Sequence, residues 1–246
     1  MAFSGIPSVI GFPQIQLNGQ NAELTPLREQ GFLLSAVDPY WGGGEFVYAR
    51  ASAAIRAFGL CVLLPVFDSA LGKLRYDAVE VANTANLGQA LCVSQQALTT
   101  GQYSWFMIAG CTPVNGTATV TAGTTVGITG AGQIGANSAG KQLIGVRSAL
   151  AATTTVVKAG CVANNAVTQL AVPNTDGWFV GAFLSGTGIA ATTTITQIDP
   201  SGRFVTLSLA TNAAISGGSI TATYNNATIF YNVVHMNRPY AQGAIT

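Results

Sequence analysis

The chain has 246 residues, of which 49% are hydrophobic and 8% are charged, and its formal net charge at pH 7 is +1. This length and apolar content are enough for one large domain or two modest ones with a sizeable core. The near-zero net charge and the scattered Lys and Arg residues argue against a nucleic-acid-binding protein, which needs a clustered basic face.

The charged side chains are concentrated at the start of the chain. The first 80 residues hold twelve of them, and the rest of the chain holds seven, which are Lys141, Arg147, Lys158, Asp176, Asp199, Arg203 and Arg238. A free soluble domain usually keeps about a quarter of its surface charged. We therefore expect an assembly component, whose surfaces are wetted by neutral polar groups or covered by other subunits.

Residues 1–36 are expected to form an extended N-terminal arm. Pro7, Pro13 and several glycines prevent a continuous helix, and an uncharged apolar arm needs a surface to cover. That surface is either the chain's own domain or, as we favour, a neighbouring subunit. The residues expected at this interface are Phe3, Ile6, Ile10, Phe12, Ile15 and, just beyond the arm, Trp41.

The sequence contains no segment expected to export or anchor the protein. The arm lacks the basic start and unbroken apolar stretch of a signal peptide. The longest strongly apolar run, 57–67, is too short to cross a bilayer. We therefore expect no membrane partner, and we expect the four cysteines to be free buried thiols in a reducing cytoplasm.

From residue 38 the chain alternates between β-rich runs and turns. The runs most typical of strands are 45–50, 60–64, 74–81, 91–94 and 103–109, each bounded by Gly, Pro, Asn or Asp. Two Thr-rich runs, 117–121 and 124–129, alternate with the period of a half-exposed strand. For 49–57 the pattern does not decide between a helical turn and a strand.

The segment 154–226 consists of short apolar runs separated by turn signals. These runs are 167–172, 178–184, 192–198, 204–209 and 219–224. Turn signals about every 8–12 residues are typical of a small β-sandwich or barrel. A last strong strand is expected at 229–234. Because no run has the pattern of a long amphipathic helix, the sequence predicts an all-β fold.

Two glycine-rich segments match nucleotide-binding patterns only in part. Segment 130–135 fits G-x-G-x-x-G, but later glycines interrupt the required helix, and no acid lies between Glu80 and Asp176 to bind a ribose. Segment 135–141 fits most of a P-loop, but Gln142 stands where a Ser or Thr must ligate Mg²⁺. We expect a surface hairpin here and no cofactor.

Other catalytic chemistry is equally sparse. His235 is the sole histidine and lies in an apolar run, where a structural or interface role is favoured over catalysis. The cysteines are neither clustered nor accompanied by histidines, as a zinc site requires. Asp77 and Glu80 are expected to be solvated at a strand end. We expect no catalytic residue, no metal site and hence no enzyme.

Three short segments resemble the small capsid decoration (cement) proteins of tailed bacteriophages. They are 38–48 (DPYWGGGEFVY), 90–94 (ALCVS) and 101–110 (GQYSWFMIAG), and a short tail at 237–240 (NRPY) also fits. The resemblance covers about 38–152 and 227–246. It implies a β-barrel or jelly-roll-like capsid-binding domain over 37–153 plus 227–246.

The segment 154–226 has no counterpart in short members of that family. It resembles a small β-module that recurs in phage and bacterial surface proteins. We therefore expect a small β-sandwich domain inserted into a surface loop of the barrel, where long insertions cost little stability.

By this resemblance, the protein is expected to be a virion structural protein on the capsid exterior, made in the host cytoplasm. Its partners would be the major capsid protein and itself, commonly as a homotrimer. The inserted module would project outward, where it could contact the host surface weakly. The alternative is a head fibre or host-surface adhesion protein of the virion.

Overall fold

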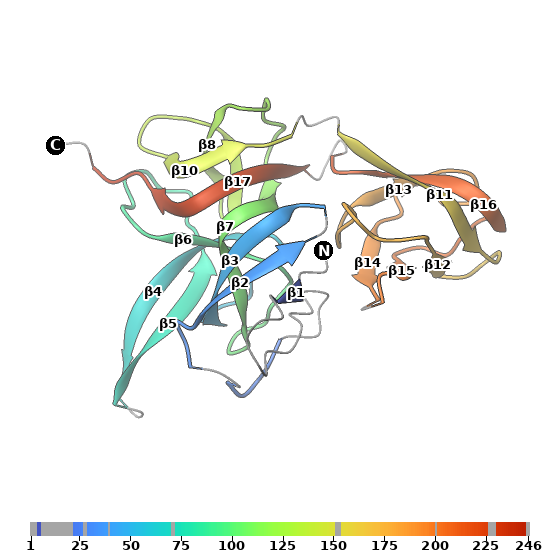
Figure 1. Cartoon of the computed structure of the whole chain (residues 1–246). Coiled ribbons are helices and arrows are strands. Elements are labelled where there is room, and N and C mark those ends of the chain that lie inside the picture. Colours follow the sequence, from blue (N-terminus) through green and yellow to red (C-terminus); the bar gives the residue numbers. More distant parts are fainter. Residues whose placement is uncertain are drawn as a thin grey trace.

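The computed structural model of the chain describes residues 4–5, 22–26, 29–38, 40–69, 72–150, 154–199, 201–225 and 230–244. Within these residues all regular secondary structure is β-strand, arranged in two sheets (Figure 1). The prediction of an all-β fold is therefore confirmed. No helix in this part of the chain is long and apolar enough to span a membrane.

The larger sheet contains eleven strands. They are β1 (Ser4–Gly5), β2 (Leu33–Asp38), β3 (Gly42–Ala51), β4 (Leu60–Asp68), β5 (Lys73–Glu80), β6 (Leu91–Ser94), β7 (Tyr103–Gly116), β8 (Thr125–Gly130), β9 (Gln133–Ala136), β10 (Gln142–Ser148) and β17 (Phe230–Ala241). Their order is β1-β2-β3-β5-β4-β6-β7-β17-β10-β8-β9. Two further pairings, β3–β7 and β7–β9, close this order into two circuits that share the long strand β7.

The main core of the larger sheet lies on one face of its strands. Side chains alternate between the two faces of a strand, so Phe46, Met107 and Met236 point inward and are at most 1% exposed. Burying each side chain of this size contributes about 1.5–3 kcal/mol. Val47 and Phe106, one position along, belong to a second buried cluster on the other side of β3 and β7.

The smaller sheet lies between β10 and β17 in sequence. Its strands are β11 (Thr155–Ala163), β12 (Gln169–Ala171), β13 (Phe183–Ser185), β14 (Ile195–Ile198), β15 (Phe204–Leu207) and β16 (Ile215–Thr223), in the order β13-β16-β11-β12-β15-β14. Figure 1 shows this sheet at one side of the larger sheet. Its core contains Leu170, Ile195 and Ile220, each at most 1% exposed.

One expected strand is absent, and several others differ from the structure in extent. The Thr-rich run 117–121 is a loop, and only the end of the run 178–184 is a strand, β13. Trp178 and Phe179 are apolar because they are core residues carried by a turn, with 0% exposure. Apolar character and β-propensity report burial as much as backbone conformation.

Other strands lie where the sequence did not indicate them. β2, β9, β10 and β11 are not among the expected runs, and β17 continues to Ala241 through the segment expected to be a tail. The undecided segment 49–57 begins as the end of β3 and then becomes a loop with an isolated bridge at Ile55.

Of the predicted arm, 1–36, the structure describes residues 4–5, 22–26 and 29–36, and the last four of these belong to β2 rather than to an arm. Ser4 and Gly5 form β1, which pairs with Val37 and Ala36 of β2 in the same chain. Five expected interface residues lie outside the described residues, namely Phe3, Ile6, Ile10, Phe12 and Ile15. A contact of the arm with a neighbouring subunit therefore stays a prediction.

Candidate interaction surfaces

One face of the larger sheet is accessible across six strands. Directly paired residues of neighbouring strands lie on the same face of a sheet, and the register aligns two rows of such residues. The rows are Ser35, Glu45, Ala109 and Asn237 of β2, β3, β7 and β17, and Cys111, His235, Arg147 and Thr125 of β7, β17, β10 and β8. All of them are exposed or half-buried. We call this surface the open face.

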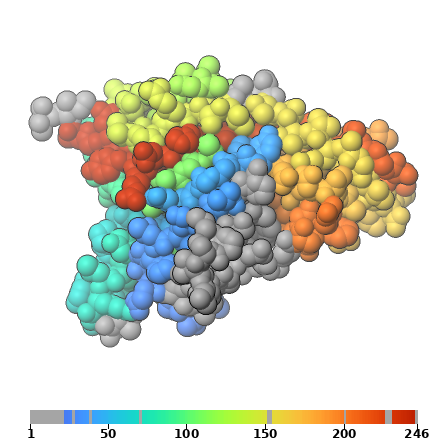
Figure 2. Space-filling view, viewed as in Figure 1, coloured from blue at the N-terminus to red at the C-terminus, as the bar shows by residue number. Residues whose placement is uncertain are grey.

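In the described part of the chain, the residues of the open face lie at the surface. Figure 2 shows its strands side by side, from β2 and β3 in blue through β7 and β17 to β10 in yellow. Two shallow hollows meet on it at His235. One of about 420 Å³ is lined by residues of β2, β3, β7 and β17, including Val37, and one of about 290 Å³ lies along β10 beside Arg147.

Glycines allow two strands to approach each other closely beneath the larger hollow. Gly110 of β7 has a φ of 114°, and a Cβ at this position would lie 2.6 Å from the carbonyl oxygen of Gly43 in β3. Any other residue at position 110 would therefore be strained and would push β3 away from β7. The close approach of these two strands leaves room above them for side chains of a partner.

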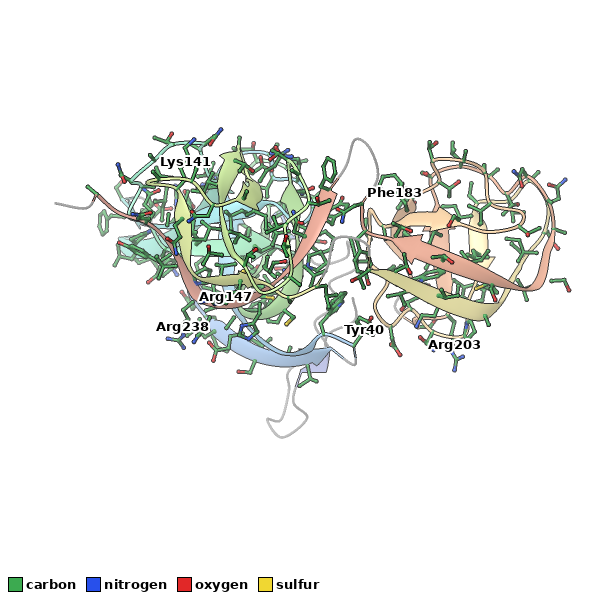
Figure 3. The ribbon with its side chains drawn as sticks, turned by 90° about the horizontal axis from the view of Figure 1, so that it is seen from above. Tyr40, Lys141, Arg147, Phe183, Arg203 and Arg238 are labelled. Carbon is green, nitrogen blue, oxygen red and sulfur yellow. The ribbon has the colours of Figure 1, made fainter. Side chains whose placement is uncertain are left out.

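Few charges lie on or beside the open face. Glu45 and Arg238 form an ion pair of 3.2 Å, and Arg147 Nη1 donates to the carbonyl oxygen of Gly123 at 3.1 Å. Figure 3 shows Arg147 and Arg238 on the same side of the larger sheet. An exposed pair of this kind contributes at most about 1 kcal/mol to stability. The open face is therefore suited to binding through shape and neutral polar groups.

The hairpin of β4 and β5 provides a second accessible surface. Figure 1 shows it extending beyond the rest of the larger sheet. Phe67 and Leu74 are cross-strand partners near its end, with 64% and 63% of their surfaces exposed. An exposed pair of large apolar side chains on a projecting hairpin is typical of a protein-protein contact element.

The carboxylates of this region are not solvated as the sequence analysis expects. Asp77 is 6% exposed and pairs with Arg75 at 3.2 Å, and Arg75 also pairs with Asp68 at 2.7 Å, which raises the pKa of its guanidinium. Glu80 binds Arg56. The expectation is wrong because β5 pairs with β3 as well as β4, so its side chains are covered and need ionic partners.

A cluster of aromatic rings joins the two sheets. Phe179 packs against Phe58 and Tyr231 of the larger-sheet region, with ring centroids 5.3 and 5.1 Å apart. Trp41 packs against Tyr224, which follows β16, at 6.1 Å. Trp41 is only 9% exposed. This expected interface residue thus lies inside the chain, at the junction between its own two sheets.

Glycines allow the two sheets to approach at this junction. Gly181 has a φ of 96°, and a Cβ there would collide with the hydroxyl of Tyr231. Gly177 has a φ of 77°, and a Cβ there would lie 2.9 Å from the ring of Tyr40. Figure 3 shows Tyr40 between the two parts of the molecule. The junction therefore depends on small residues as well as on aromatic ones.

The nucleotide-like segment 130–135 spans the end of β8, the turn at 131–132 and the start of β9. A hairpin replaces the strand and helix that a dinucleotide site requires. A Cβ on Gly132 would lie 2.7 Å from the carboxyl carbon of Glu80, and the N–H of Gly132 donates to a backbone carbonyl. A phosphate bound at this turn would therefore be repelled by the carboxylate of Glu80. In the P-loop-like segment, Lys141 Nζ donates to Asn83 Oδ1 at 2.8 Å.

The cysteines do not form a reactive site. All four are free thiols, as the sequence analysis expects, with Cys61, Cys92 and Cys161 buried and Cys111 half-buried. Burial raises the pKa of the Cys61 thiol well above its usual value and also raises that of Cys111, and a neutral thiol is a poor nucleophile. Among the described residues, no three His, Cys, Asp or Glu side chains are placed to share a metal ion.

No protein-family model, no curated protein and no solved structure matches the chain. Its function is therefore inferred from the surfaces described above and from the resemblance of its short sequence segments.

Proposed function

We propose that the chain is a bacteriophage capsid decoration protein. In this role it binds the outer surface of the head, stabilises the lattice of the major capsid protein, and assembles as a homotrimer on the capsid exterior. The larger sheet, whose pairings form two closed circuits, corresponds in this proposal to the β-barrel of that family.

The observation that carries the proposal is the meeting of the three resembling segments in one place. They contain β3, β6 and β7, and β7 pairs with both of the others. Tyr48 of β3 pairs with Trp105 of β7, and Met107 of β7 pairs with Val93 of β6. Short matches that arise by chance have no reason to become neighbouring strands. Two of these strands, β3 and β7, also build part of the open face.

The chemistry of the open face supports binding to a lattice. It offers His235, amide and hydroxyl groups and small side chains, with few charges. A contact of this type is weak for one copy. Repetition over a closed shell and within a trimer raises the effective concentration, so that weak contacts suffice. The scarcity of charge after residue 80 is consistent with a protein surface that is buried against other subunits.

The test is binding to expanded heads assembled from the major capsid protein of the same virus. The chain is mixed with these heads and sedimented, and the bound fraction is measured. Ala109→Lys places a long charged side chain in the middle of the open face. We expect it to weaken binding about tenfold or more, which corresponds to about 1.4 kcal/mol per site.

Ala85→Lys is the matched control. Ala85 is exposed and lies beside Gly140, and Figure 3 shows the neighbouring Lys141 on the side of the larger sheet opposite Arg147. This variant should bind heads like the original chain. Absence of the original chain from the sedimented heads, or equal binding by both variants, would contradict the proposal.

A further inference from the structure

A pocket of about 370 Å³ opens at one end of the larger sheet, apart from the open face. Its walls come from the loop after β3, the end of β7, the start of β9 and the start of β17. The side chains that matter chemically are Arg56, Asn115, Gln133, Phe230 and Tyr231. Its volume lies within the usual range of small-molecule sites, about 300–1,000 Å³.

The fixed charges of this pocket cancel. The Nε and Nη2 groups of Arg56 donate to the two carboxylate oxygens of Glu80 at 2.9 and 2.7 Å, and the backbone N–H of Arg56 donates to the same carboxylate at 2.8 Å. The hydrogen bonds that the guanidinium donates to the Glu80 carboxylate raise the pKa of Arg56. An ionic ligand would have to break this bidentate pair, whereas the Nη1 donors have no acceptor in the described part of the chain.

Two side-chain amides present acceptors in fixed orientations. Asn115 Nδ2 donates to the carbonyl oxygen of Ala57, and Gln133 Nε2 donates to that of Gly116 at 3.3 Å. Each amide is thus held by the backbone through its nitrogen, and its oxygen makes no hydrogen bond to another described residue. Groups that are held in place before binding lose little entropy when a ligand arrives.

Phe230 supplies the accessible aromatic surface of the pocket, next to the buried Tyr231 in the chain. Tyr231 is 9% exposed and its ring packs against Phe58 at 6.0 Å and against Phe179 at 5.1 Å, which fixes its orientation. Phe230 is half-buried beside it. The pocket therefore combines fixed donors, fixed acceptors, rigid rings and no net charge.

We propose that this pocket binds a neutral saccharide of one or two rings. A sugar ring presents C–H groups on its faces and hydroxyl groups, each a donor and an acceptor, at its rim. A C–H face suits the half-buried ring of Phe230, and the hydroxyl groups suit Arg56 Nη1 and the oxygens of Asn115 and Gln133. The proposal is independent of head binding, since the pocket and the open face use different residues.

The test is ligand-observed NMR titration of the full chain with a panel of neutral mono- and disaccharides. Sialic acid and adenosine form two further arms, for an anionic sugar and for a planar base. We expect at least one neutral sugar to bind with a Kd of about 1 mM. Binding of none of them at about ten times that concentration, or binding of only sialic acid or adenosine, overturns the proposal.

Two glutamine variants locate the site. Gln133→Met keeps the size of the side chain but removes the acceptor, and we expect it to weaken sugar binding about fivefold, as loss of one hydrogen bond does. Gln142→Met is the matched control, because Gln142 is also half-buried and also begins a strand. Equal affinity of both variants and the original chain overturns the proposal. Head binding by Gln133→Met should be unchanged, which separates this result from failure of the proposed function.

Discussion

Two tyrosines at the junction keep their hydroxyl groups away from water. Burial raises the pKa of both Tyr224 and Tyr231 above the usual value near 10, and Tyr224 Oη donates to the carbonyl oxygen of Gly177 at 2.8 Å. In the unfolded chain these phenols ionise near pH 10, but in the folded chain they stay neutral to higher pH. The stability that they contribute is fully present below about pH 10, and it is lost as the pH rises through their folded-state pKa values.

We therefore expect the free energy of unfolding to fall steeply above about pH 10. The raised pKa of the buried Cys61 thiol acts in the same direction from about pH 9. Urea unfolding at a series of pH values measures the decline, and phenolate absorbance shows whether the buried tyrosines ionise only on unfolding. Tyr224→Phe should make the decline shallower, and Tyr240→Phe, at an exposed position, should not. Ionisation of every tyrosine in a chain that stays folded would contradict this.

A single glycine explains why β10 is not recognisable from sequence. Gly145 has a φ of 75°, and the register of β10 against β17 shifts between Ile144 and Val146 around it. This is an irregularity of the β-bulge kind in which the extra residues lie in β17, because Gly145 alone stands opposite Asn237, Arg238 and Pro239. A local pattern shows the glycine as an interruption. Only the pairing with β17, some ninety residues later, shows that the strand continues through it.

We expect Gly145→Ala to lower the free energy of unfolding by about 2–3 kcal/mol. The positive φ is unfavourable for alanine, and its Cβ would lie 2.7 Å from the carbonyl oxygen of Asn237. Gly123→Ala is the matched control, since Gly123 has a φ of 76° but nothing within 4 Å of the added carbon. It should cost about 1 kcal/mol. Equal losses of unfolding free energy for the two variants, measured by urea unfolding, would show that the contact of the added Cβ with β17 does not destabilise the fold.

The strands that sequence analysis locates share a simple feature. β4, β6 and the first half of β7 are runs of apolar or aromatic residues preceded by turn residues, so their conformation and their first residues are visible locally, whereas β4 continues to Asp68 beyond the expected run. Most of β2, Leu33–Asp38, falls within the arm predicted for 1–36 and is not distinguished from it by composition. In the smaller sheet, Trp178 and Phe179 resemble strand residues because the core requires them, although they lie in a turn.

The sequence predicts the fold class better than it predicts the candidate surfaces. His235 is recognisable as the sole histidine, and its exposure follows from alternation with the buried Val234 and Met236. The open face itself depends on pairing between residues such as Ala109 and Asn237, which are far apart in the chain. No local pattern specifies that register. Trp41 is expected at an interface with a neighbouring subunit, but the structure packs it against Tyr224, which is distant in sequence.

Side-chain packing connects the two sheets in addition to the covalent chain. Ring contacts between Phe179 and Phe58 and between Trp41 and Tyr224 cross from one to the other, and Figure 1 shows the smaller sheet beside the ends of β10 and β17. A module inserted into a surface loop costs little if it folds alone. Removal of this module would expose Phe58 and Tyr231 to water, so the larger sheet depends on it.

We therefore expect the whole molecule to unfold in one cooperative transition by differential scanning calorimetry. Phe179→Ala should lower the free energy of unfolding by about 3–5 kcal/mol and should split the transition in two, because Phe179 is 0% exposed and is shared by both sheets. Leu170→Ala is the matched control: it removes a fully buried side chain of the smaller sheet away from the junction, at a cost of about 2–5 kcal/mol. It should lower the single transition without splitting it. Two transitions in the original chain, or one in Phe179→Ala, would mean that the ring cluster does not couple the sheets.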